Sequence, residues 1–212
     1  MPEIPGNQEH QNTQNDSYLK QSRRNFLRGF GTGAALVTGY FAGKEILHNK
    51  ETTPHEEFLN HQKQIATYAA KYAWLEEFIT STAKETDSYQ PSQKLAEQIF
   101  IYNAQFRNIY ESYLSWSEEA AGLLDNNDKL RLGLKQTVDL VLETHKKIAA
   151  QGNLKQLMGA EMVKEQEKHK ENPQKMAQIK SYYDLISLEQ IITDEVRQAG
   201  DIFLAKFNHI QI

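Results

Sequence analysis

The sequence predicts an all-α protein: an antiparallel up-and-down helical bundle of four long helices and one shorter charged helix, after a disordered N-terminal arm. Two observations support this bundle. Apolar side chains recur every three or four positions along the segments after residue 50, which is the period of one helix face. Short turns with proline, glycine or asparagine separate these segments, and short connections are typical of antiparallel neighbours. Residues 1–21 are instead rich in Asn, Gln, Glu and Ser without a helical period, as in a disordered leader.

The bundle domain is predicted over residues 53–212, after a linker over residues 44–52. Thr53, Pro54 and Glu56 have the pattern of a capping box with proline in the first turn, so the first helix is expected to begin there. A second helix is expected after Pro91, and its face alternates steps of four and three residues. A period near 3.5 favours left-handed packing of the coiled-coil kind. The first face consists of Phe58, His61, Ile65, Tyr68, Tyr72, Leu75, Ile79 and Thr82; the second consists of Leu95, Ile99, Tyr102, Phe106, Ile109, Tyr113, Trp116, Ala120 and Leu123.

The second half of the domain follows a turn at residues 125–128 and is expected to contain three further helices. The third helix is predicted to end at Gly152, because glycine adopts the left-handed terminating conformation easily. Residues 153–172 would form the shorter, less buried helix, whose charged end is expected to be solvated. Pro173 would start the last helix. The apolar positions of the third and last helices are Leu130, Leu134, Val138, Val141, His145 and Ile148, then Ile179, Tyr183, Ile186, Val196, Ala199, Phe203, Phe207 and Ile210.

Composition limits the function classes. Apolar residues make up 39% and charged residues 25% of the 212 residues, and the mean hydropathy is -0.68, which argues against a polytopic membrane protein. The net charge is -4, and residues 44–212 are more acidic than the arm, so no nucleic-acid partner is expected. The chain has no cysteine, which excludes disulfides, thiolate metal sites and cysteine nucleophiles.

The arm contains a basic motif followed by an uncharged run. Ser22, Arg23, Arg24, Phe26 and Leu27 precede fifteen uncharged residues, 29–43, which end before Lys44. The run is shorter than the roughly 20 residues that span a bilayer, but its length suits the apolar region of an export signal. Residues 22–43 resemble a bacterial twin-arginine (Tat) signal peptide, whose pattern is S-R-R-x-F-L-K, although Arg28 replaces the usual lysine. The resemblance implies export of a folded chain by the twin-arginine translocase to the periplasm or the outer face of the cytoplasmic membrane.

The end of this segment departs from the signal-peptide pattern. A good A-x-A cleavage site is missing, and Val37-Thr38-Gly39 is the least unfavourable alternative. The segment therefore has two expected fates, which are removal and retention as a marginal N-terminal membrane anchor.

Candidate ligand residues lie on the helical faces. His61 and His145 fall on the apolar stripes of two long helices, so they would bind haem or a divalent metal if those helices faced each other. Tyr68 and Tyr72 belong to an aromatic-rich zone and would line such a site. A hydrogen-bonded core histidine and ordinary aromatic packing are the more common roles at such positions. Glu-x-x-His does not occur in residues 50–212, so no di-iron site is expected. The expectation is no metal or cofactor, with haem or a divalent metal at these histidines as the alternative, and catalytic residues stay unassigned.

Three functions remain open. The first is an exported cell-envelope protein with a non-catalytic binding, scaffold or assembly role, whose helix faces would contact a protein partner or a second copy. The second is an envelope cofactor protein or small enzyme that uses haem or a histidine- or carboxylate-bound metal, and the third is a membrane-acting helical protein. The sequence favours the first function, since it combines an export motif with helices that carry no catalytic pattern.

Overall fold

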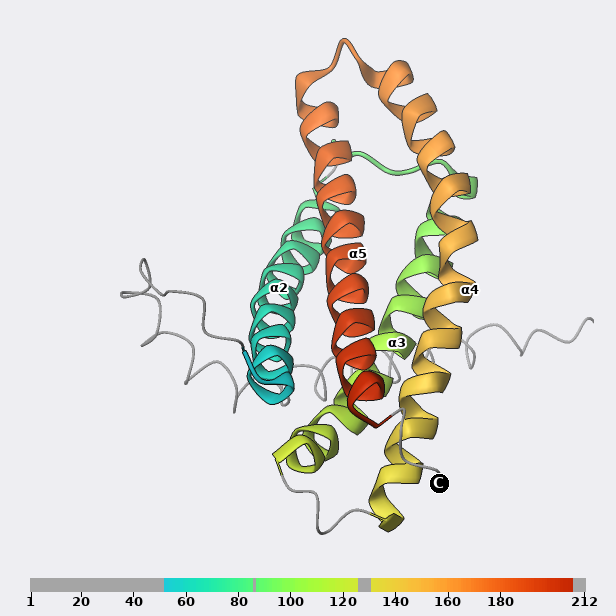
Figure 1. Cartoon of the computed structure of the whole chain (residues 1–212). Helices are drawn as coiled ribbons and strands as arrows, with labels where there is room; N and C mark the ends of the chain where they lie inside the picture. The colour runs from blue at the N-terminus through green and yellow to red at the C-terminus, as the bar shows by residue number, and fades with distance from the viewer. Residues whose placement is uncertain (1–51, 86, 126–130, 208–212) are drawn as a thin grey trace, which may run out of the picture. The chain divides into compact units, whose positions relative to one another are not determined.

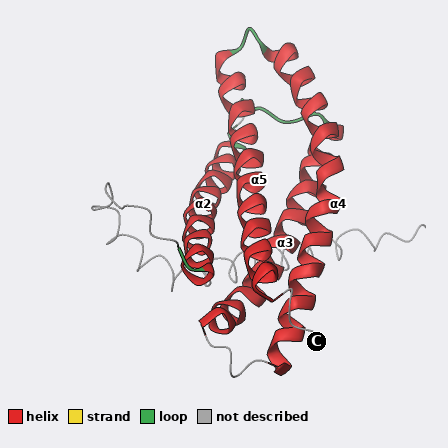
Figure 2. Ribbon diagram, in the orientation of Figure 1, coloured by secondary structure: helices red, strands yellow, loops and turns green. Residues whose placement is uncertain are grey.

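The computed structural model describes residues 52–85, 87–125 and 131–207. Four helices occupy this part of the chain: α2 (Pro54–Thr82), α3 (Gln93–Asp125), α4 (Arg131–His169) and α5 (Pro173–Phe207). These described residues include no strand (Figure 2), which confirms the all-α class. The predicted leader and export motif and most of the predicted linker lie in residues 1–51, outside the described residues. Most of the predicted turn at residues 125–128, Leu130 and Ile210 also lie outside them.

The helices run alternately up and down (Figure 1), which confirms the predicted bundle. The most extensive contacts join α2 to α5 and α3 to α4, and further contacts join α4 to α5 and α2 to α3. Helix α3 also contacts α5 across the interior, whereas no contact among the described residues joins α2 to α4. The α3–α5 contact is therefore the short diagonal of the bundle.

Local signals set three of the helix ends. The Thr53 hydroxyl accepts from the Glu56 backbone N–H at 3.2 Å, and the Glu56 carboxylate accepts from the Thr53 N–H at 3.0 Å, so the predicted capping box is confirmed. The Ser92 carbonyl and hydroxyl accept the first hydrogen bonds of α3. Asn172 caps α5, since its side-chain oxygen accepts from the Lys175 N–H at 3.0 Å ahead of Pro173.

The predicted end of a helix at Gly152 is wrong. Helix α4 continues without a break from Arg131 to His169, and Gly152 has helical backbone on the exposed side of that helix. The expectation that the charged stretch is solvated is also wrong for one residue, because Glu165 is buried. Met158 and Met162 explain this packing: they belong to a core cluster with Leu95, Ile99, Tyr102 and Ile186, which extends the bundle along the second half of α4.

Large aromatic side chains fill the interior between the four helices. Trp116, Tyr72, Tyr102, Phe58, Phe106 and Phe203 are among the largest fully buried side chains. The predicted stripe of α3 is buried from Leu95 to Ala120, while at its end Leu124 is buried in place of Leu123. The Trp116 indole N–H donates to the Thr144 hydroxyl of α4 at 3.2 Å, so this polar tip has the partner that a buried tryptophan needs.

Candidate functional site

A carboxyl group lies in the middle of the apolar interior. Glu189 of α5 has 0% of its side-chain surface exposed, and it occupies the same helix face as Leu185, Ile186, Ile192 and Val196. An ionised carboxylate in such surroundings loses its hydration, which disfavours the charged form. Burial accordingly raises the pKa of Glu189 to about 8, although Tyr72 and Arg107 partly oppose this rise.

Helix α3 supplies the amide that holds the Glu189 carboxyl. In the orientation that its surroundings favour, the Asn103 side-chain nitrogen donates to the two Glu189 carboxyl oxygens at 3.0 and 3.2 Å. The same nitrogen donates to the Ile99 carbonyl at 3.0 Å. This amide therefore ties α5 to α3 across the short diagonal of the bundle.

Helix α2 faces Glu189 with a tyrosine and a second carboxylate. The Tyr72 ring packs on the Phe106 ring with centroids 5.0 Å apart, and burial, followed by the charge of Glu189, raises the Tyr72 pKa far above its ordinary value. Towards the surface, the Arg107 guanidinium donates to the Glu76 carboxylate at 2.6 Å, and both side chains are half-buried. We call the group Tyr72, Glu76, Tyr102, Asn103, Arg107 and Glu189 the Glu189 cluster.

This arrangement has defined chemical properties. A neutral Glu189 keeps one O–H to donate and still accepts from Asn103, as the donor and acceptor inventory of a protonated carboxyl allows. The Arg107 guanidinium is already paired with the Glu76 carboxylate at 2.6 Å, so its charge is only partly available to an ionised Glu189. Because no part of the carboxyl is exposed, a solute reaches it only when the helices separate.

His61 and His145 contact α5 from different helices. His61 of α2 pairs with the Glu195 carboxylate, which also accepts from Gln64 at 2.8 Å once the Gln64 amide is oriented to donate. The His145 Nε2 of α4 lies 3.3 Å from the Arg197 carbonyl oxygen and 3.8 Å from the Asp201 carboxylate.

The close approach of α4 to α5 depends on a glycine. A Cβ atom on Gly200 would lie 2.6 Å from the His145 Nε2, so the imidazole occupies the space that any other residue would fill. Gly200 and Glu195 are five positions apart on α5, or about 140° around a helix of 3.6 residues per turn. The two imidazoles therefore lie against different sides of α5.

The two predicted tyrosines have different surroundings. Tyr72 is buried in the Glu189 cluster, whereas Tyr68 is half-buried and lies under the Lys71 ammonium, which is 5.5 Å from the ring centroid. The described residues contain no group of three or more His, Asp or Glu side chains placed to hold a metal ion.

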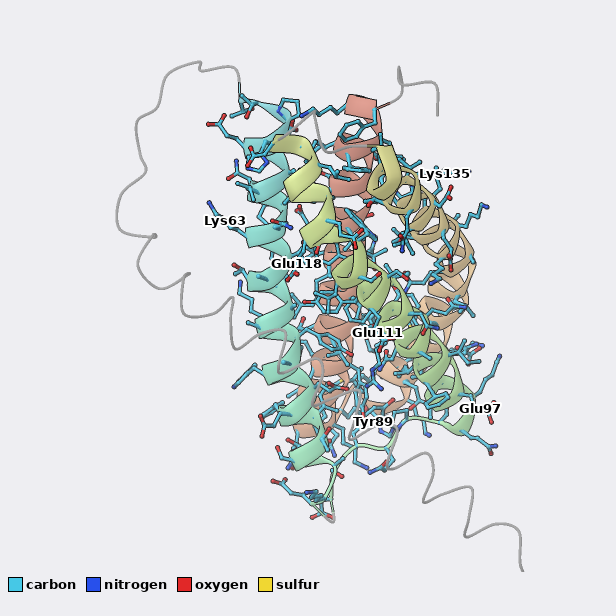
Figure 3. The ribbon with its side chains drawn as sticks, turned by 90° about the horizontal axis from the view of Figure 1, so that it is seen from below. Lys63, Tyr89, Glu97, Glu111, Glu118 and Lys135 are labelled. Atoms are coloured by element: carbon cyan, nitrogen blue, oxygen red, sulfur yellow. The ribbon has the colours of Figure 1, made fainter. Side chains whose placement is uncertain are left out.

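A second polar cluster lies where the α2–α3 connection meets α4 and α5. The Tyr89 hydroxyl donates to the buried Glu165 carboxylate at 3.2 Å, and the Tyr89 backbone N–H donates to Gln178 of α5. His169 lies 3.6 Å from the same carboxylate and packs against the edge of the Tyr89 ring. Figure 3 labels Tyr89 at the end of the bundle where α2 ends and α3 begins. Tyr89 therefore joins the connection to α4 and α5, beside a small surface pocket that it lines together with Phe78 and Tyr182.

The outer side of α2 carries an exposed aromatic pair. Trp74 is 68% exposed and Phe78 is 43% exposed, and their rings stack with centroids 5.9 Å apart and planes 14° apart. Both positions lie opposite the Tyr72 and Glu76 side of α2, since they follow those residues by two positions or about 200°. We call Trp74 and Phe78 the outer aromatic pair.

Sequence reasoning missed both the Glu189 cluster and the outer aromatic pair, but each leaves a signal. Glu189 interrupts the predicted apolar stripe between Ile186 and Val196 at the spacing of a core position. Trp74 and Phe78 are large aromatic residues that fall off the predicted stripe of their helix, four positions apart. A charged residue on the stripe and aromatic residues off it were the two departures to notice.

No protein-family model, curated protein or solved structure matches the chain in the comparisons made with each. None of the described helices is both long enough and apolar enough to span a membrane.

Proposed function

We propose that the chain is an exported cell-envelope protein with a non-catalytic binding or assembly role, and that α2 presents its binding surface. The outer aromatic pair carries the binding part of this proposal. The resemblance of Ser22, Arg23, Arg24, Phe26 and Leu27 to a twin-arginine signal supports the export part, with the translocase as partner during export.

The physical argument for binding starts from the cost of exposing aromatic surface. Exposed apolar area is unfavourable by roughly 25 cal/mol per Å², so a tryptophan that is 68% exposed gains free energy when a partner covers it. Tryptophan is enriched among the residues that dominate binding energy at protein interfaces. The stack with Phe78 restricts the orientations of the indole, which reduces the entropy that binding removes.

Export is tested by replacing Arg23 and Arg24 together with lysine and fractionating the cells. The double variant is expected to stay in the cytoplasm, because the two charges remain but the receptor-recognised pair is lost. Lys20→Arg is the matched control, since it changes a basic residue next to the motif and should leave export intact. Unchanged export of the double variant would contradict the signal interpretation.

Binding is tested by placing a photo-crosslinking amino acid at position 74 or 78 in intact cells. Adducts to a protein partner are expected from both positions and not from position 143, where an exposed glutamate lies on α4. If position 74 gives no more adduct than position 143, α2 does not present the binding surface. Haem or a divalent metal is the alternative to the expected absence of a cofactor, and it requires His61 and His145 to meet. The two imidazoles instead lie against different sides of α5, and metal analysis of the purified chain tests whether either of them binds a metal.

A further inference from the structure

The Glu189 cluster joins three helices through one carboxyl group. Glu189 belongs to α5, Asn103 belongs to α3 and Tyr72 belongs to α2, and these three side chains meet inside the bundle. Separation of α5 from the other two helices would therefore transfer the carboxyl from an apolar interior to water.

We propose that opening of α5 away from α2 and α3 is coupled to release of the Glu189 proton, so that the bundle opens more readily as the pH rises from acid to neutral. This device is independent of the proposed export and binding roles. It makes Glu189 a pH-dependent lock on the interior of the bundle.

The groups that face Glu189 come from the neighbouring helices, and two of them, Tyr72 and Arg107, oppose its neutral form. From α2 come Tyr72 and the negative Glu76, and from α3 come Tyr102, the neutral Asn103 and the positive Arg107. Arg107 is bonded to Glu76, so these two charges largely offset each other. On the α4 side, the hydroxyl of Thr193, one turn along α5 from Glu189, donates to the neutral Gln151 at 3.5 Å. Desolvation is therefore the dominant influence, and it raises the pKa of Glu189 from 4.5 to about 8.

The sign of the pH dependence follows from these two values. At pH values between 4.5 and about 8 the closed bundle holds the Glu189 proton, whereas an opened bundle with a hydrated carboxyl has lost it. The opening equilibrium therefore shifts towards the open form by roughly tenfold per pH unit in this window. Above the pKa of the closed form both states are ionised, and the dependence levels off.

Hydrogen exchange of the α5 amides around Glu189 measures this opening. The intact chain and its Glu189→Gln variant are compared at each pH from 6 to 9, so that the intrinsic pH dependence of exchange cancels. We expect the opening constant of the unmodified chain to rise by about 30- to 100-fold between pH 6 and pH 8, relative to Glu189→Gln, as one linked proton requires. Glu118→Gln removes an exposed carboxylate from α3 and is the matched control; it should follow the unmodified chain.

Equal pH dependence in the unmodified chain and in Glu189→Gln would overturn the proposal. If Glu189→Gln does not fold, carbon-13 NMR of the glutamate carboxyl carbons in the unmodified chain decides the question. A Glu189 carboxyl that is still protonated at pH 6 and titrates near pH 8 supports the coupling, and one that is already ionised at pH 6 rules it out.

Discussion

Replacing Gly152 with alanine tests the most unexpected feature of the fold, the unbroken α4. Gly152 lies in the interior of this helix on its exposed side, and apart from its chain neighbours and the adjacent backbone of α4 no heavy atom lies within 4 Å of the position that a Cβ would take. Glycine is less favourable than alanine at such a position by roughly 0.5–1 kcal/mol, because it loses more backbone entropy on folding. We therefore expect Gly152→Ala to raise the free energy of unfolding by about 0.5–1 kcal/mol.

Chemical and thermal denaturation followed by circular dichroism will measure this gain. For a domain of this size, 1 kcal/mol corresponds to about 2–4 °C in Tm. Gly159→Ala is a matched control in the same helix, since its Cβ would also meet open space, and it should stabilise the protein by a similar amount.

The opposite result would refute the continuous helix. If Gly152 had the left-handed conformation of a helix terminus, alanine would be strained there and the variant would be less stable than the unmodified protein. A loss of stability in Gly152→Ala together with a gain in Gly159→Ala would place a helix end at Gly152, where the sequence pattern alone predicted it.

Two further substitutions test close contacts. Gly200→Ala should lower the free energy of unfolding by about 1 kcal/mol, since overpacking costs about 1–3 kcal/mol and helix propensity returns part of it. In a His145→Ala background the loss should shrink to the contribution of the second close neighbour, Val141, which would lie 3.1 Å from the added Cβ, and an undiminished loss would contradict the clash with His145. Thr53→Ala should cost about 1 kcal/mol through loss of the capping box, measured by urea unfolding against Thr52→Ala, and equal stability of the two variants would show that the cap contributes nothing.

The sequence predicted the helix faces better than the contacts between them. The stripe of α3 was predicted almost residue by residue, because every step of three or four positions returns to one side of a helix. The period of the apolar residues does not show which neighbouring helix contacts each flank of a given helix. For this reason the pairing of His61 with Glu195, 134 positions away in the chain, was out of reach.

Gly152 and Glu189 mark the two places where local rules gave way to packing. Glycine predicted a helix end, but the burial of Met158 and Met162 against α3 and α5 continues the helix beyond it. A charged side chain ordinarily favours a solvated position, but Glu189, for which the sequence pattern made no prediction, lies in the core because Asn103 and Tyr72 contact it there. Both departures have one cause, since contacts between distant segments outweigh a local preference such as the roughly 1 kcal/mol of a helical glycine.

Polar residues beside the apolar stripes also explain why the bundle has one handedness. Apolar stripes alone allow the four helices to form two rings, in which the chain passes around the bundle axis in opposite directions. Each helix has the same two neighbours in both rings, but these neighbours lie on exchanged flanks of the helix. On α2, His61 contacts Glu195 of α5, while the next residue, Gln62, donates to the Ser117 carbonyl of α3 at 3.2 Å. In the ring of opposite hand, His61 would face α3 and Gln62 would face α5, so both contacts would be lost and the half-buried Glu195 would lose its His61 partner. The apolar stripes thus determine that the helices associate, and adjacent polar residues on opposite flanks favour the ring that the structure has.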